Sequence, residues 1–101
     1  MPNTEKIGHE VQTLYEKKFT YRDKINQLGI VIASFRKMRG MTQEQLSEKA
    51  GISRTFLSSI EAPGTSRAFS LEVLYALADA LNVKPGDLLN FADDSERLIE
   101  K

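Results

Sequence analysis

Polar side chains that can donate and accept hydrogen bonds gather in one short segment, residues 53–61. The most informative of them is Arg54, whose planar fork of N–H groups matches the O6 and N7 acceptors of guanine in the major groove of DNA. Thr55 and Ser59 are one helical turn apart and can reach base edges or thymine methyl groups, directly or through water. The alternatives for Arg54 are a phosphate contact and a solvated surface position.

A helix over this segment would put its polar side chains on the outside. Leu57 and Ile60 are three residues apart and therefore share one face, which we expect to be buried. Ser53 is a suitable N-cap for that helix. Phe56 falls between the two faces, so it either packs at the edge of the core or touches a thymine methyl group or the sugar-phosphate rim. We favour the core edge, because exposing an aromatic ring is unfavourable.

A second short helix is predicted directly before the first. Thr42 followed by Gln45 forms a capping box at the start of a helix over about 43–49, with Leu46 facing inward. Gly51 ends it. Two short helices joined around a glycine are typical of the helix-turn-helix arrangement.

The N-terminal third predicts two further helices. Thr20 and Asp23 resemble a capping box, which divides a helix over about 4–18 from another over about 21–38. Each carries an apolar stripe, made of Ile7, Val11 and Leu14 in the first, and of Ile25, Leu28, Ile32 and Phe35 in the second. The first stripe is narrow, and it suits either packing on the same domain or dimerisation.

The C-terminal part predicts two more helices. Residues 62–68 are loop by composition, and Ser70 caps a helix over about 71–81 that ends at Asn82. Pro85 suits the first turn of a last core helix that runs to Leu89. The remaining residues, 92–101, are expected to form a tail that adds a helical turn or frays.

Composition excludes several kinds of chemistry. The chain has no cysteine and one histidine, His9, so neither thiolate ligands nor a histidine cluster is available for a metal. No nucleophile–base pair and no glycine-rich phosphate loop is recognisable, so we expect no enzyme activity, no cofactor and no small-molecule substrate. No apolar run approaches the ~20 residues that span a bilayer, and no secretory signal is present. We expect a cytoplasmic protein without a membrane partner.

Charge is distributed unevenly although its sum is zero. Residues 1–33 hold five Lys/Arg against four Asp/Glu, residues 34–67 hold six against three, and residues 68–101 hold three against seven. The middle third, which contains the two short helices, is therefore net positive. This favours an anionic partner, although a solvated face often carries a similar excess.

From Leu28 to Leu89 the sequence resembles the Cro/repressor-type helix-turn-helix domains, the XRE family. The resemblance rests on residues that match the family pattern in order and at the correct spacing. They are Ile32, Phe35 and Arg36, then M-T-Q-E-Q-L-S-E-K-A-G-I-S from Met41 to Ser53, Leu57-Ser58, Ile60-Glu61, Leu71, Leu74, Leu77-Ala78, Ala80 to Val83, and Leu88. It implies an all-α, five-helix, lambda-repressor-like domain over residues 20–91, with an extra N-terminal helix in the arm 1–19. The third helix of that domain, 53–61, would lie in the major groove.

The resemblance also implies roles for other residues. Gln43 would bond a DNA phosphate and brace the recognition helix, and Arg36 and Glu61 would form a partly buried ion pair. Further backbone or orienting candidates are Thr42, Ser53, Phe56, Ser58 and Arg67, with Lys37 and Arg39 as weaker ones. The chain departs from the family at Ser47, where alanine is preferred, and in the loop after Glu61, which is about two residues longer and has Pro63-Gly64.

The function expected from these patterns is sequence-specific binding of double-stranded operator DNA by a homodimeric transcriptional regulator, in particular a repressor. Dimerisation would use the N-terminal stripe or the C-terminal acidic helices. An antitoxin or the controller of a restriction system would use the same fold. A protein-interaction module that has lost DNA binding is a third alternative, which acidic replacements on the outer face of helix 53–61 would favour.

Overall fold

The computed structural model describes residues 13–64 and 67–100, and within these ranges the regular secondary structure is entirely helical. The helices are α2 (Leu14–Met38), α3 (Gln43–Ala50), α4 (Arg54–Glu61), α5 (Leu71–Leu81) and α6 (Pro85–Glu100). The predicted all-α fold class is confirmed. In the described part of the chain, no helix combines the length and the apolar composition needed to cross a membrane.

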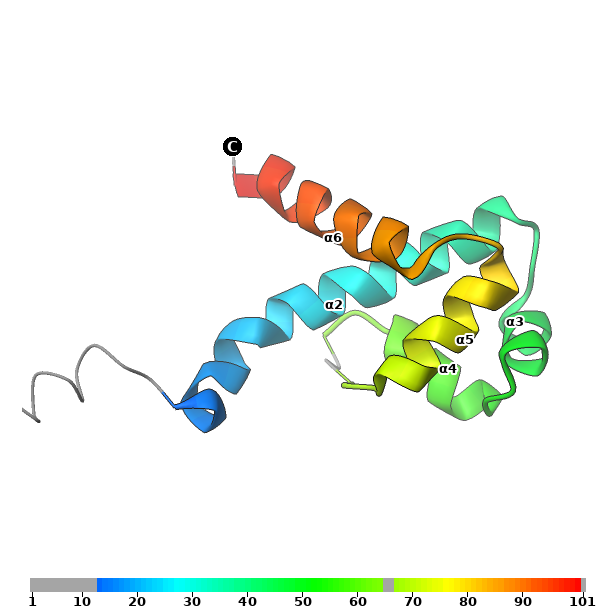
Figure 1. The fold of residues 1–101 in the computed structure, drawn as a ribbon, viewed down its shortest axis with the longest axis horizontal. Coiled ribbons are helices and arrows are strands. Elements are labelled where there is room, and N and C mark those ends of the chain that lie inside the picture. The colour runs from blue at the N-terminus through cyan, green and yellow to red at the C-terminus, as the bar shows by residue number, and fades with distance from the viewer. Residues whose placement is uncertain (1–12, 65–66, 101) are drawn as a thin grey trace, which may run out of the picture.

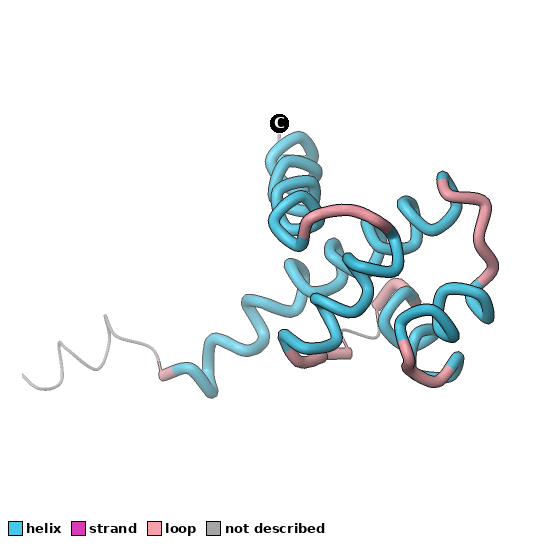
Figure 2. The backbone as a smooth tube through the Cα atoms, turned by 45° about the vertical axis from the view of Figure 1, so that its right-hand side comes forward, coloured by secondary structure: helices cyan, strands magenta, loops and turns pink. Residues whose placement is uncertain are grey.

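The long helix α2 is the element on which the others are assembled (Figure 1). It packs against α4, α5 and α6, while α3 packs against α4 and α5. Its N-terminal part projects beyond the other helices (Figures 1 and 2). The core lies around the C-terminal part of α2, and its buried members are Val31, Ile32, Leu46, Leu57, Ile60, Leu74, Leu77, Ala78, Ala80, Leu81, Leu88 and Ala92.

Each of the helices α3, α4 and α5 begins at a hydroxyl side chain. Thr42 Oγ1 accepts a hydrogen bond from the Gln45 amide at 3.1 Å, and the Gln45 side-chain oxygen Oε1 accepts one from the Thr42 amide at 2.9 Å. Ser53 and Ser70 accept in the same way from the amides three residues further on. The three caps predicted from sequence are confirmed, and each satisfies an amide that lacks a partner within its helix.

The helices α2, α3 and α5 end in a common way. A residue in the left-handed conformation follows each of them: Gly40, Gly51 and Asn82. The next residue then donates its amide to the carbonyl five positions earlier, which together with the bond from the left-handed residue is the Schellman motif. These next residues are Met41, Ile52 and Val83, and all three pack against the core. Helix ends are thus fixed by burial of a side chain as well as by hydrogen bonds.

The structure contradicts the predicted helix start at Thr20. The single helix α2 runs through this position from Leu14, so Thr20 and Asp23 do not form a cap. No glycine or proline interrupts residues 14–28, and a continuing helix satisfies the same amides with backbone carbonyls. Of the predicted N-terminal stripe, Ile7 and Val11 lie outside the described residues, and Leu14 is exposed.

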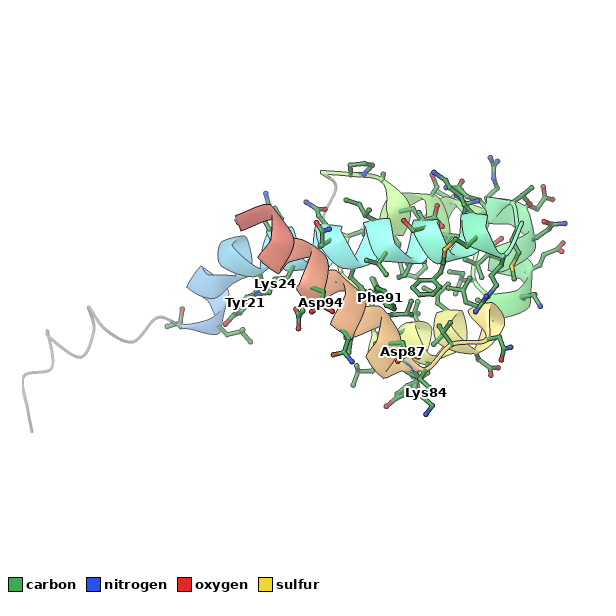
Figure 3. The ribbon with its side chains drawn as sticks, turned by 90° about the horizontal axis from the view of Figure 1, so that it is seen from above. Tyr21, Lys24, Lys84, Asp87, Phe91 and Asp94 are labelled. Atoms are coloured by element: carbon green, nitrogen blue, oxygen red, sulfur yellow. The ribbon has the colours of Figure 1, made fainter. Side chains whose placement is uncertain are left out.

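The last helix is also longer than predicted. Instead of ending near Leu89, α6 continues to Glu100, so the residues expected to add a helical turn or fray are helical as far as residue 100. The middle of α6 is anchored on α2, because Ala92 is buried and the Phe91 ring meets Phe35 edge to face, with 5.3 Å between centroids. Figure 3 shows Phe91 on α6 beside α2. This packing, which depends on distant residues, is what sequence pattern did not reveal.

Candidate nucleic-acid interface

The turn between α3 and α4 holds the two short helices in a fixed relation. Gly51 has φ +77°, and its amide bonds the carbonyls of Ser47 and Glu48. Ile52 follows and packs on the core, and α4 starts immediately after Ser53. The left-handed conformation is one that residues with a Cβ rarely adopt, so glycine suits this turn.

The inner face of α4 is completely enclosed. Leu57 is fully buried and Ile60 is 4% exposed, as their spacing predicted. At the same crossing the backbone of α2 comes very close, because a Cβ placed on Gly29 would overlap the carbonyl oxygen of Ile60. Gly29 therefore decides how near α2 and α4 can lie. Sequence analysis missed this residue, although a glycine in the middle of an apolar helical pattern indicates a packing contact.

A buried polar cluster ties the end of α4 to α2 and α3. Arg36 forms two parallel bonds with Glu61, Nε to Oε2 at 2.9 Å and Nη2 to Oε1 at 3.0 Å. The side chains of Arg36 and Glu61 are 11% and 4% exposed, so the pair is largely removed from water. The third guanidinium nitrogen, Nη1, donates to the Met41 carbonyl at 2.8 Å. The two residues that the family resemblance paired do lie together.

Gln43 joins the same cluster from the first turn of α3. Its Nε2 donates to Glu61 Oε1 at 3.0 Å, so this oxygen accepts bonds from both α2 and α3. Gln43 therefore braces α4 through Glu61. An amide nitrogen carries two N–H groups, so the bond to Glu61 uses one of them.

The outer face of α4 has a different character. Arg54, Thr55 and Ser58 are exposed, and no carboxylate of α4 lies among them, since Glu61 is buried on the inner side. Ser59 is half-buried, and its hydroxyl donates to the Phe56 carbonyl at 2.7 Å. Of the predicted base-contact residues, Arg54 and Thr55 point outward together, while the Ser59 hydroxyl bonds within its own helix.

Phe56 and Arg67 come together at one margin of this outer face. The Phe56 ring is partly buried and packs against the core, which is the position favoured from sequence. The guanidinium carbon of Arg67 lies 5.1 Å from the centre of that ring. Gly64, which has φ +85°, lies in the loop that leads from α4 toward Arg67.

Other residues predicted to contact or orient the DNA backbone have structural roles. The hydroxyls of Thr42 and Ser53 cap α3 and α4. Arg39 donates from Nε to the Leu81 carbonyl at 2.9 Å, so it binds the C-terminal end of α5, where a cation is favourable. Ser47 is buried, and its hydroxyl donates to the Glu44 carbonyl, so it occupies the family's alanine position without an unsatisfied polar group.

Two short helices joined at a left-handed glycine, the second with a buried apolar face and an exposed polar one, define a helix-turn-helix protein. A helix-turn-helix family model matches residues 32–88, more than half of the chain, so the chain belongs to this family, as the resemblance predicted. The chain is 35% identical over 69 residues to the HTH-type transcriptional regulator SinR of Bacillus licheniformis. This match covers 68% of the chain and 61% of SinR, so the chain spans less than two thirds of that relative.

Solved structures agree with this assignment. The clp gene regulator ClgR from Corynebacterium glutamicum superposes with a TM-score of 0.70 at 30% identity, covering 76% of this chain and 80% of ClgR. The restriction-modification controller protein C.Esp1396I, in its complex with a 25 base pair operator site, gives a TM-score of 0.63 at 28% identity. That comparison covers 70% of this chain and 91% of C.Esp1396I.

Proposed function

We propose that this chain is a transcriptional regulator that binds double-stranded DNA at specific sequences, with α4 lying in the major groove. The observation that carries the proposal is the division of α4 into two faces. Leu57, Ile60 and Glu61 anchor it from behind, while Arg54 and Thr55 stand exposed on the other side. The major groove admits one α-helix and presents a distinct pattern of donors and acceptors for each base pair.

Within this proposal, base readout belongs to Arg54 and Thr55, with a smaller part for Ser59. Gln43 contacts a phosphate with the N–H that does not bond Glu61, and the backbone amides at the start of α3 favour the same anion. Ser58 faces outward beside the groove wall. Phosphate contacts of this kind fix the register of the protein on the duplex and supply most of the affinity.

We further propose that the chain acts as a homodimer and as a repressor in the cytoplasm. Two recognition helices about 34 Å apart would meet successive major grooves on one side of the duplex. The operator complex of C.Esp1396I supports a duplex partner for a fold of this kind. Repression follows if the bound site overlaps a promoter.

The test is selection of bound duplexes from a random pool with the full chain, at 50 and 150 mM NaCl. We expect enrichment of a palindromic sequence with half-sites about 10 base pairs apart. Affinity for the selected site should exceed that for random duplex by about 10³-fold or more. Equal affinity for selected and random duplexes would contradict sequence-specific binding, and a selected motif without two-fold symmetry would contradict the dimer.

A second candidate function is control of a restriction-modification system, because C.Esp1396I is a restriction-modification controller protein. It is favoured because 91% of that controller is covered by this chain, which leaves little of the controller without a counterpart. The two functions differ in their target. A controller would bind upstream of its own gene beside restriction or methyltransferase genes, and mapping the selected motif onto the source genome separates the two.

A further inference from the structure

A surface groove between α2 and α6 has no part in the arrangement that presents α4. Its volume is about 420 Å³, and it is lined by Val31, Ser34, Phe35, Met38, Asp87 and Phe91. Figure 3 shows Asp87 and Phe91 one after the other along α6. Met38 and Phe91 are 68% and 53% exposed, and large apolar side chains that are exposed together often mark a binding site.

The groove lies on the side of α2 that faces away from α4. Successive residues of an α-helix are turned by about 100°, so Met38 points the opposite way from Gly29, which contacts the backbone of α4. Ser34 is turned from Gly29 by about 140° and lies on the same side as Met38. A duplex that contacts the outer face of α4 would therefore leave the groove accessible.

The two polar side chains of the groove are acceptors toward an occupant. The Ser34 hydroxyl uses its hydrogen in the bond to the Ile30 carbonyl, at 3.0 Å, and keeps its lone pairs. The Asp87 carboxylate accepts only, and it forms no ion pair with any residue that the structure describes. An occupant must therefore bring N–H donors, and a positive charge beside Asp87 is favourable.

The rest of the lining is apolar, and two of its members are aromatic. Phe91 comes one helical turn after Asp87, so a cation bound to the carboxylate also lies close to the ring, which attracts cations. The flexible thioether side chain of Met38 can adapt its shape to an occupant. These walls suit a ligand with an apolar body and a cationic end.

The dimensions favour a small ligand over a helix of a partner protein. Val31 and Met38, at the two ends of the groove along α2, are seven residues apart, which corresponds to about 10 Å. The volume lies within the range of about 300–1,000 Å³ that is typical of small-molecule sites. We propose that the groove binds a small primary amine with an aromatic or aliphatic body, its ammonium group bonded to Asp87. Such a ligand is bound and not converted, so it differs from a substrate.

The test is a titration of the full chain with three ligands of one shape, followed by the shifts of its amide NMR signals. The ligands are 3-phenylpropylamine, its neutral match 3-phenylpropan-1-ol and its anionic match 3-phenylpropionate. We compare D87N and F91L with the wild type. D93N is the control, because Asp93 is an exposed acid of the same helix that does not line the groove. Thermal melts show whether each variant keeps its fold.

We expect the amine to bind with a dissociation constant of about 1 mM, roughly tenfold more tightly than the alcohol, with the propionate weakest. D87N should reduce the affinity for the amine to that for the alcohol and leave the alcohol unchanged. F91L should weaken the amine about threefold, because an aliphatic side chain does not attract the cation. D93N should behave like the wild type. The largest shifts should be those of the residues that line the groove.

Four results would overturn the inference. Equal affinity for the three ligands would mean that the groove does not select a charge. An equal loss in D93N and D87N would mean that the acids of α6 attract the amine without a defined site. No binding of the amine at 10 mM, or shifts located away from the groove, would exclude the site. Dissociation of a dimer by D87N or F91L, measured by light scattering, would mean that a second copy of the chain covers the groove. None of these readouts involves DNA, so the proposed regulator function is tested separately.

Discussion

The two faces of α4 are built on opposite principles. On the inner face the polar side chains have fixed partners. The single carboxylate of Glu61 accepts hydrogen bonds from both Arg36 and Gln43. On the outer face, Arg54 and Thr55 extend into solvent with no contact that fixes them. The inner face therefore determines where the helix lies, and the outer face determines what it can recognise.

This difference teaches that the two properties can be changed separately. The contacts that hold α4 involve α2 and α3, and the hydrogen bonds among them go to the buried Glu61. Substitutions on the outer face should alter sequence preference while the free energy of unfolding stays constant. Substitutions behind the helix should lower stability first and DNA affinity as a consequence.

The largest effect is expected for Arg36→Ala. It removes three hydrogen bonds and leaves the carboxylate of Glu61, which is 4% exposed, without its cationic partner. We expect a loss of about 3–5 kcal/mol in the free energy of unfolding and a fall in melting temperature of more than about 10 °C. Urea denaturation followed by circular dichroism measures it. A melting temperature equal to that of the wild type would show that the cluster does not hold α4.

The next effect concerns Gly29 and has a matched control on α6. Gly29→Ala forces a methyl group onto the Ile60 carbonyl, which is backbone and cannot rotate away, so we expect a loss of about 1–3 kcal/mol. Gly86→Ala meets nothing within 4 Å and should be neutral or slightly stabilising, because alanine favours helix. The same denaturation measurement serves for both. Equal stability of the two variants would mean that α2 and α4 separate without penalty.

Much of this scaffold was predictable from local pattern. The caps at Thr42, Ser53 and Ser70, the turn at Gly51 and the inward leucine and isoleucine of α4 all depend on residues within four positions of one another. Local hydrogen bonds and helical periodicity decide such features, and both are visible in a sequence.

The features that escaped prediction depend on residues far apart in the chain. Gly29 contacts Ile60 across 31 positions, and Phe35 meets Phe91 on a helix that was expected to end earlier. The helix start predicted at Thr20 was wrong for a different reason. A local capping pattern was present there, but the helix continues through it. For the site, the pairing of Arg36 with Glu61 came from family resemblance, whereas the contact of Arg67 with the Phe56 ring crosses a loop longer than the family's, so local pattern did not reveal it.

On the outer face, Arg54→Ala should change recognition without changing stability. Arg54 is exposed, so its removal should alter the free energy of unfolding by less than about 0.5 kcal/mol. If it reads a guanine, the variant should lose about 1–3 kcal/mol of preference for that base, which is roughly 5- to 150-fold in relative affinity. Competition binding with single-base variants of the selected duplex measures this. A uniform loss for all duplexes would instead assign Arg54 to a phosphate.

The smallest effect is expected for Ser59→Ala, which tests whether the base-contacting part of the outer face includes Ser59. The Ser59 hydroxyl donates to the Phe56 carbonyl at 2.7 Å and is half-buried, so it is less available to a base than the Thr55 hydroxyl one turn earlier. We expect a change of less than about 0.5 kcal/mol in stability and less than about threefold in affinity for any single-base variant of the duplex. Thr55→Ala, measured in the same competition assay, is the matched comparison and should show the larger change.

The opposite order, in which Ser59→Ala loses more discrimination between bases than Thr55→Ala, would contradict this. It would mean that the hydroxyl of wild-type Ser59 leaves the Phe56 carbonyl when the protein binds DNA. The reading surface would then extend to the margin where Arg67 stands.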